Sequence, residues 1–254
     1  MAGENATSAS DKTLAVLSAA LTHARFTDVL AATGLPKATV HRIAGTLVAH
    51  GYVTLGDDGR YLPGPAALRL AGAALERVDI STVSAPTITR LVEDTGCAVH
   101  IGVLSGEEVI YVARRESDKP YRMPSRIGKA IHLHSTAIGK AILADLPTGA
   151  LERLVARTGL VARTPNTITD PVVLADEVAA VRRAGYAIDD EENEPGIRCV
   201  GAAIRDHTGL VTYGISLSTL ALEHTKSQVE AMAPLAIAAA RDISAGLGHR
   251  NTCP

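Results

Sequence analysis

The stretch LPKATVHRIAGTLVAHGYV, residues 35–53, decides how the first part of this 254-residue chain folds. Its apolar side chains recur three and four residues apart, which predicts a helix over residues 36–50 with one buried face. Proline suits the start of such a helix, because its missing N–H would have no intrahelical acceptor there. The opposite face and the first turn present small and basic side chains, namely Lys37, Ala38, Thr39, His41, Arg42 and Gly45.

Two helices are predicted before this one. The first begins near Asp11, a suitable N-cap residue, and ends at about residue 24. The second is short, covers residues 28–32 and takes Thr27 as its cap. Gly34 then supplies the tight turn into the third helix, because glycine adopts a positive φ without steric cost. Two short helices joined by a glycine turn are typical of a helix-turn-helix.

A β-hairpin is predicted directly after the third helix. Residues 52–55 and 60–62 are short alternating runs, and the turn sequence Gly-Asp-Asp-Gly at 56–59 separates them. Such a hairpin is the wing of a winged helix-turn-helix. We therefore expect a DNA-binding domain over residues 11–64, preceded by a polar, disordered tail over residues 1–10.

The distribution of charge supports a DNA-binding head. Taken alone, the formal net charge of -2 argues against a nucleic-acid partner. Between Lys12 and Arg69, however, six basic residues face three acidic ones, a net of +3, so that the rest of the chain carries -5. A structural or protein-binding winged helix is the alternative. We expect Arg42 to read a base, and Lys37 and Arg60 to contact the backbone or minor groove, within the predicted contact set Lys37, Thr39, His41, Arg42 and Arg60.

A linker helix and a second domain follow the head. The linker, residues 65–80, is apolar over much of its circumference, so we expect a second copy of the chain to cover it. Residues 81–248 read as hairpins mixed with helices, which predicts an α+β fold with a mainly antiparallel sheet. Within this domain, residues 189–195 are predicted to form an acidic loop and residues 223–247 one continuous helix.

Composition narrows the location of the protein. The chain is 46% hydrophobic and 20% charged, and it lacks an apolar run of the length that spans a membrane. Its three cysteines are widely spaced, which fits a reducing compartment better than a disulfide framework. We therefore expect a cytoplasmic protein with no membrane partner. The chain has no Trp and a single Phe, so any aromatic contact with a ligand should come from Tyr or His.

The chain resembles the IclR-type bacterial transcription regulators over about residues 11–247. The resemblance rests on the segment quoted above, on HSTAIGKAILADLP at residues 134–147, and on TITDPVVLADEVAAVRRAGYAIDDEENEPGIRCVGAAIRDHTGLVTYGISLS at residues 167–218. The last segment follows the family patterns G-Y-A-x-D-x-E-E, G-x-x-C-V-A and D-x-x-G. The resemblance implies a winged-helix head, a dimer-forming linker, and a GAF-like domain that binds a small organic carboxylate and alters affinity for a pseudo-palindromic operator. It also implies self-association as a dimer or a dimer of dimers.

The resemblance places the effector pocket at Met123, Ile131, Ala137, Ile138, Asp189, Ile197, Cys199, Ser216 and Ser218. These positions make chemical sense for a carboxylate. The free amides at the start of the helix after Thr136 attract an anion, and serines two residues apart on a strand project from one face. The chain departs from the family pattern at His132, Ala203 and Thr219, so the ligand of a relative does not transfer to it.

Other interpretations of these residues remain open. Cys199 is also compatible with a small buried hydrophobe, Asp189 with a solvated loop acid, and the serines with packing hydroxyls. A metal-responsive regulator would use His132, His134 and Cys199 as ligands. An enzyme would use Cys199 as nucleophile and His132, His134 or His207 as base, but an activated thiolate needs an electropositive, accessible setting. We therefore predict a ligand-responsive regulator, a repressor by family habit, with no catalytic residue, metal or cofactor.

Overall fold

The computed structural model describes residues 8–119 and 123–250. The chain divides into two compact units, Met1–Val78 and Asp79–Pro254. Within the described ranges, no helix combines the length and the apolar character that crossing a membrane requires.

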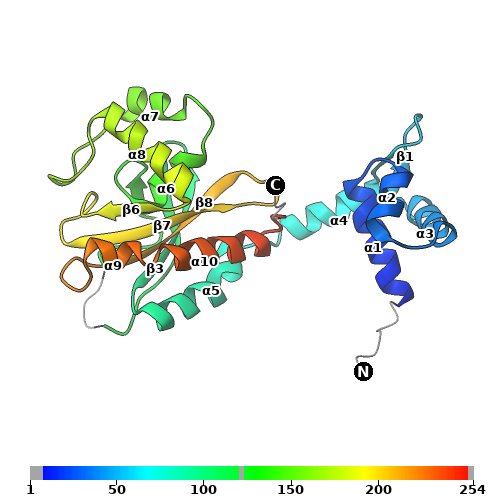
Figure 1. Ribbon diagram of the computed structural model, residues 1–254, viewed down its shortest axis with the longest axis horizontal. Helices are drawn as coiled ribbons and strands as arrows, with labels where there is room; N and C mark the ends of the chain where they lie inside the picture. The colour runs from blue at the N-terminus through cyan, green and yellow to red at the C-terminus, as the bar shows by residue number, and fades with distance from the viewer. Residues whose placement is uncertain (1–7, 120–122, 251–254) are drawn as a thin grey trace. The chain divides into compact units, whose positions relative to one another are not determined.

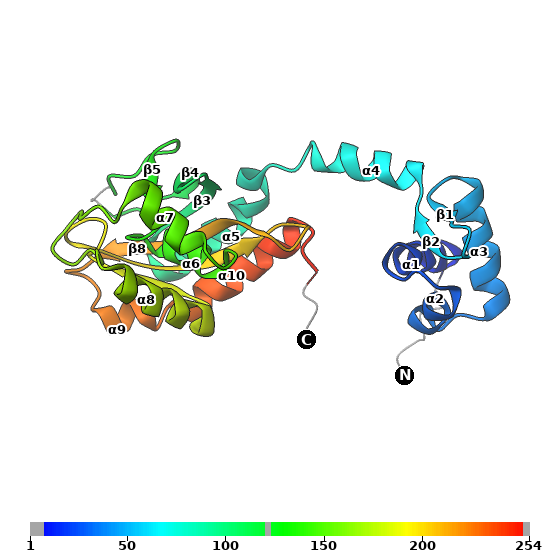
Figure 2. The same cartoon turned by 90° about the horizontal axis from the view of Figure 1, so that it is seen from above.

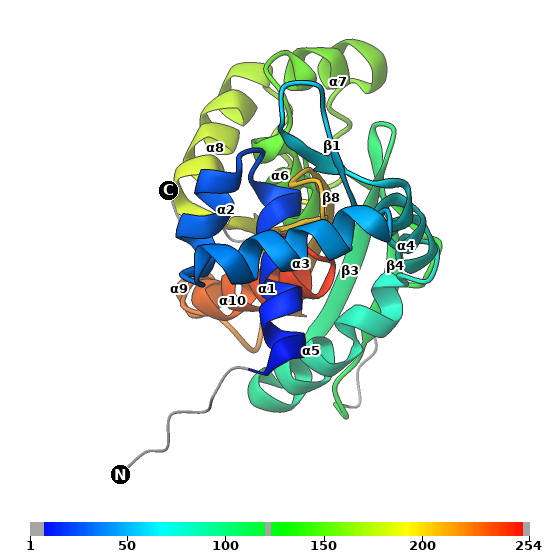
Figure 3. The same cartoon turned by 90° about the vertical axis from the view of Figure 1, so that its right-hand side faces the viewer.

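The first unit contains a winged helix-turn-helix. Three helices pack around a small apolar core that includes Val16, Val40 and Leu47, and Figure 3 shows α3 crossing α1 within this unit. The wing is an antiparallel pair in which Thr54 lies opposite Leu62. The elements are α1 (Ala9–Thr22), α2 (Phe26–Thr33), α3 (Lys37–Ala49), β1 (Val53–Leu55) and β2 (Tyr61–Pro63).

Two predicted helix starts in the head are wrong. The Ser8 side chain accepts from Asp11 N, and the Asp11 carboxylate accepts from Ser8 N, so this capping box starts α1 before Asp11. Residues 8–10 therefore do not belong to a disordered tail, and residues 1–7 of that predicted tail lie outside the described residues. Helix α2 begins at Phe26 without a side-chain cap, so Thr27 is not its cap. The predicted turn at Gly34 is confirmed, with φ of 61°.

The linker is shorter than predicted and has an exposed apolar surface. Helix α4 (Pro65–Leu75) starts on the wing, where Ala66 N donates to Gly51 O. It ends well before residue 80, because Asp79 caps a new helix, α5 (Ile80–Thr95), through the amides of residues 81 and 82. No residue of α4 is buried within this chain, and Leu68 is 62% exposed. A surface of this kind suits burial by a partner.

The second unit is an α+β domain built on an antiparallel sheet, as predicted. Its described strands run in the order β5-β4-β3-β8-β7-β6. Figures 1 and 2 show α5 and α10 along one face of the sheet and α6 and α8 along the other. The bounds are β3 (Ala98–Ser105), β4 (Glu108–Arg115), β5 (Ala130–His132), α6 (Ala137–Asp145), α7 (Ala150–Thr158), α8 (Pro171–Ala184), β6 (Ala187–Asp190), β7 (Ile197–Arg205), β8 (Val211–Leu220), α9 (Lys226–Glu230) and α10 (Ala233–Gly246).

Helix α6 lies unusually close to the sheet, because glycines face it. A Cβ at Gly201 of β7 would meet the backbone carbon of Ala137 at 2.9 Å. A Cβ at Gly214 of β8 would meet a methyl of Ile138 at 2.8 Å. Side chains at these strand positions would push the helix away. The glycines therefore fix where the N-terminus of α6 points.

Two predictions for the second unit are wrong. The predicted helix over residues 223–247 is two helices, α9 and α10, because Pro234 near the start of α10 cannot donate a helical hydrogen bond to a preceding turn. The predicted acidic loop begins later than residue 189. Asp189 belongs to strand β6, where it lies opposite Cys199 of β7.

Candidate effector cavity and DNA-binding face

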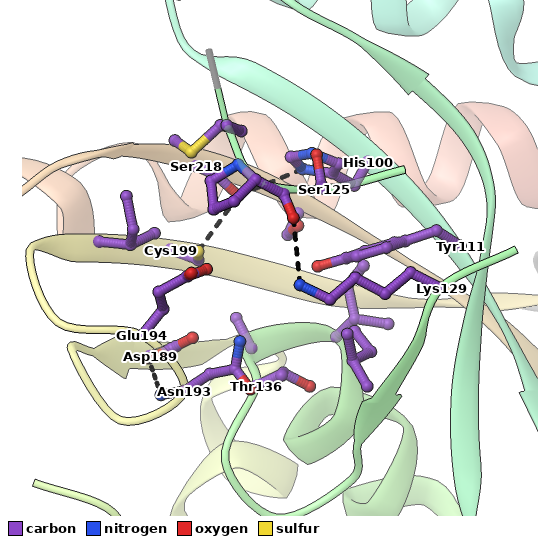
Figure 4. Close-up of a pocket in the computed structure, with 17 residues that line it drawn as sticks. His100, Tyr111, Ser125, Lys129, Thr136, Asp189, Asn193, Glu194, Cys199 and Ser218 are labelled. Atoms are coloured by element: carbon purple, nitrogen blue, oxygen red, sulfur yellow. Dashed lines mark hydrogen bonds between the residues drawn. The ribbon is translucent and has the colours of Figure 1, made fainter. Parts of the chain in front are cut away.

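A small cavity lies between the N-terminus of α6, the sheet and the turn after β6 (Figure 4). Its free volume is about 30 Å³, which is room for roughly two or three water molecules. All nine residues predicted for the effector pocket line it: Met123, Ile131, Ala137, Ile138, Asp189, Ile197, Cys199, Ser216 and Ser218. That they bind an effector stays a prediction.

Sequence reasoning missed about half of the lining. The missed residues are His100, Tyr111, Pro124, Ser125, Lys129, Thr136, Asn193 and Glu194. Of these residues, His100 could have been identified from the sequence, since it is a polar residue in an otherwise apolar strand segment. Tyr111 and His100 are the aromatic side chains of the lining, and their ring centroids are 5.0 Å apart. That an effector makes its aromatic contacts with Tyr or His stays a prediction.

The start of α6 contributes backbone amides to the lining of the cavity. Thr136 caps the helix, because its hydroxyl accepts from Gly139 N at 3.0 Å. The amides of Ala137 and Ile138 lack an intrahelical acceptor, and the helix dipole adds roughly half a positive charge there. Figure 4 shows Lys129 and Glu194 pointing their charged ends toward each other across the cavity. The helix end offers an anion fixed donors.

A chain of hydrogen bonds crosses the sheet side of the cavity. The Cys199 thiol donates to Ser218 Oγ at 3.1 Å, and Ser218 Oγ lies 3.3 Å from His100 Nδ1. His100 Nε2 lies 2.8 Å from Ser125 Oγ. Burial, followed by the nearby Arg114 charge, lowers the pKa of His100 to about 4. The ring is therefore neutral near pH 7, so this side of the cavity is polar without being charged.

Asp189 and Ser216 leave polar groups free to meet a ligand. Asp189 is 3% exposed, and its Oδ1 accepts from Glu192 N at 2.8 Å and Asn193 N at 3.3 Å. It is not a solvated loop acid, because it is buried in strand β6. Burial and then the Glu192 charge raise its pKa to about 7. Ser216 is also 3% exposed and lines the cavity, and its hydroxyl takes part in none of the hydrogen bonds found among the described residues.

The two alternative chemistries find no support in this geometry. Burial, followed by the Asp189 charge, raises the pKa of Cys199, so its thiol stays protonated, whereas a nucleophile needs the thiolate. His134 lies 3.1 Å from Val161 O rather than beside that thiol. Within residues 8–119 and 123–250, no three His, Cys, Asp or Glu side chains gather to hold a metal.

The outer face of α3 carries the predicted DNA contacts. Lys37, His41 and Arg42 are exposed, whereas Thr39 is half-buried in the first turn. The ring of His41 packs edge to face against Phe26 of α2, with centroids 6.2 Å apart. Arg60 on the wing pairs with Asp58 at 3.1 Å, so part of its charge is compensated.

Gly45 on this face has no structural reason to be glycine. Glycine inside a helix costs about 0.5–1 kcal/mol relative to alanine. A Cβ at Gly45 would meet nothing within 4 Å, and its φ is not positive. The missing side chain therefore leaves room for a surface outside the chain.

The fold and the cavity together define a ligand-responsive DNA-binding regulator. The helix-turn-helix model of the IclR regulators matches residues 11–55, and the model described as "Bacterial transcriptional regulator IclR C-terminal" matches residues 72–245. The chain belongs to the IclR family of transcriptional regulators. Families of this kind act on transcription rather than as enzymes.

Relatives and solved structures agree with this assignment. The regulator BhcR of Paracoccus denitrificans is 33% identical, over 88% of this chain and 81% of the relative. The transcriptional repressor IclR of Escherichia coli is 31% identical, over 87% and 82% of the two chains. The crystal structure of the Agobacterium tumefaciens repressor BlcR matches with a TM-score of 0.79 and 26% identity, over 98% of this chain and 100% of that one.

Replacing Asp189 by Asn should change how stability depends on pH. Because the folded-state pKa of about 7 exceeds the ordinary value of 3.8, the folded protein binds this proton more tightly between those two pH values. The wild type should therefore lose stability relative to Asp189→Asn as the pH rises from about 4 to 7, by up to about 4 kcal/mol. Urea unfolding at pH 5 and 8 measures the difference.

The neighbouring Asp190 provides the matched control. Arg198 lowers the pKa of Asp190, so Asp190→Asn should show no such trend between pH 5 and 8. A difference between wild type and Asp189→Asn that is the same at both pH values contradicts the prediction.

Replacing Gly45 by Ala should stabilise the head and weaken DNA binding. Alanine favours the helix by about 0.5–1 kcal/mol, while its methyl group occupies the space left for DNA. We expect roughly fivefold weaker operator binding, the loss of about 1 kcal/mol. Thermal unfolding and fluorescence anisotropy with operator DNA measure the two effects. Ser18→Ala on exposed α1 should stabilise without changing affinity, and unchanged affinity in Gly45→Ala would show that DNA does not approach this residue.

Proposed function

We propose that this regulator is a repressor whose cavity binds a small organic carboxylate and thereby alters affinity for a pseudo-palindromic operator. The observation that supports the proposal is that three groups line the same cavity. They are the free amides at the start of α6, the Ser216 hydroxyl and the buried Asp189 carboxyl. The amides and the serine can donate to the carboxylate of the acid, while Asp189 can bond a second polar group.

The proposal includes self-association in the cytoplasm. The exposed apolar side chains of α4, among them Leu68 and Leu70, suit burial against a second copy of the chain. A two-fold dimer then presents two recognition helices to two half-sites, and a dimer of dimers would use two such pairs. In the head, Lys37, Thr39, His41, Arg42 and Arg60 are the proposed DNA contacts.

Regulation requires that the acid prefer one of two arrangements of the protein. An acid that binds both arrangements equally shifts nothing, however tightly it binds. Coupling between two sites is typically about 1–3 kcal/mol, which changes operator affinity by roughly 5- to 150-fold. The α4 helices are the proposed path of this coupling.

A thermal-shift panel tests the effector class. We expect at least one of acetate, lactate, succinate and benzoate to raise the melting temperature, because a ligand of the folded state stabilises by about 2.7 kcal/mol at a hundred times its Kd. The matched amides, such as lactamide and benzamide, should not, because they lack the charge that the α6 N-terminus attracts. Ser216→Ala should reduce the shift. Equal shifts with acids and amides would overturn the carboxylate assignment.

Replacing Arg42 by Ala should abolish specific operator binding. An arginine that reads a base contributes about 1–3 kcal/mol, and its charge adds to the phosphate attraction. The acid-induced thermal shift should stay unchanged, because the cavity lies in the other unit. Arg183→Ala, which removes an exposed charge from α8, is the control and should bind DNA normally. Unaltered operator affinity in Arg42→Ala would remove Arg42 from the contact set.

A further inference from the structure

Lys140 of α6 is a lysine without any exposed surface. Its Nζ lies 2.6 Å from Glu192 Oε1, in the turn after β6, and 2.9 Å from Glu177 Oε1 of α8. A buried ion pair is often no more stabilising than apolar residues of the same size, whereas breaking one is costly. Stability alone is therefore a weak reason for this cluster, and its geometry suggests another role.

The turn that Lys140 holds is strained. Glu191 has φ of 60°, a left-handed conformation that side chains other than glycine rarely adopt. The neighbouring carbonyl of Glu192 accepts from Thr167 Oγ1 at 2.6 Å. A strained backbone conformation persists only when contacts with the surrounding structure stabilise it. The ion pair of Glu192 with Lys140 and the ion pair of Glu191 with Arg198 are charged parts of that support.

The same turn orients Asp189. The amides of Glu192 and Asn193 both donate to Asp189 Oδ1, so the position of the turn sets the direction of this carboxyl. Lys140 does not line the cavity, whereas Asp189 does. The link from the ammonium to the cavity therefore runs through Glu192 and its backbone.

We propose that Lys140 is a positioning residue of the effector cavity, which its buried contact with Glu192 links to the Asp189 carboxyl. This proposal rests on the proposed effector role of the cavity. Helix α6 then holds both sides of the site. Its first amides face the ligand directly, and its lysine fixes the opposite wall at a set distance from them.

Alkylation of Cys199 by iodoacetamide tests this in the full chain without a ligand. Cys199 lies opposite Asp189 on neighbouring strands and lines the cavity, so a displaced turn should uncover it. Lys140→Met should raise the rate of Cys199 labelling about tenfold or more. The double variant Lys140→Met with Glu192→Met replaces the pair by apolar side chains of similar volume, so it should fold, and it should label as fast.

Glu177→Gln is the matched control. It removes the charge of the other partner of Lys140 but leaves the contact with the turn, so Cys199 should label within about twofold of the wild-type rate. Cys97 is 2% exposed in the same unit, and its rate should not change in any variant. Wild-type labelling of Cys199 in the double variant, or equal acceleration at Cys97, would overturn the proposal.

The pH dependence of stability distinguishes a specific effect on Asp189 from a general loss of stability. The titratable groups that interact with Asp189 or Lys140 include Glu192, Glu177, His134, Cys199 and Tyr111. Removing the Glu192 charge by Glu192→Gln should lower the pKa of Asp189, because that charge raises it in the wild type. The pH window over which Asp189→Asn alters stability should then end at a lower pH. An unchanged window in this background argues against an electrostatic link between the turn and Asp189.

Measuring the affinity of the same variants for an acid connects the role of Lys140 to effector binding. With the panel acid of largest thermal shift, the double variant should bind about tenfold more weakly and Glu177→Gln as tightly as the wild type. If no acid of the panel binds, the proposed function fails, while Cys199 labelling still decides the role of Lys140.

Discussion

The contact between α6 and the sheet is the constraint on which the sensor unit depends. Glycines at 201 and 214 let the helix lie directly on the strands, where side chains would force it outward. This closeness puts the first amides of α6 at the cavity and takes Lys140 fully out of water. Because a buried ammonium needs partners, the helix in turn fixes the β6–β7 turn through Glu192. One packing contact thus positions two walls of the site, the α6 amides and the turn that carries Glu192.

The two units solve different electrostatic problems. The head exposes cations on α3, because exposed positive charges attract the phosphate backbone of DNA through the solvent and over a long range. The cavity is lined mainly by neutral polar groups, namely helix-end amides, the His100 imidazole and hydroxyls, with the charge of Lys129 at its edge. Neutral groups suit a buried site, because a charge taken fully out of water needs compensation. The whole-chain charge of -2 averages these two solutions and describes neither.

The sequence predicted the architecture well where periodicity and turn residues act locally. The helix-turn-helix, the wing and the antiparallel sheet followed from apolar spacing and from residues such as Gly34. The predicted helix boundaries were wrong where a capping residue or a proline competes with that spacing, as at Ser8 and Pro234. All nine expected cavity positions gather around one cavity, but that expectation came from family motifs. Lys129 and Tyr111 were not predictable, because β-strand pairing and loop paths bring them there from positions without a local signal.

The size of the cavity affects the timing of a response. The described cavity has about 30 Å³ of free volume, room for roughly two or three water molecules, so entry of the proposed acid would need the surrounding walls to move apart. A required opening step slows association below the diffusion limit, and the same step delays release. Occupancy of the site by the proposed effector would then follow the average supply of the acid rather than its brief fluctuations. On the proposed function, a cavity with so little free volume would make the response an average of the supply of the acid over time.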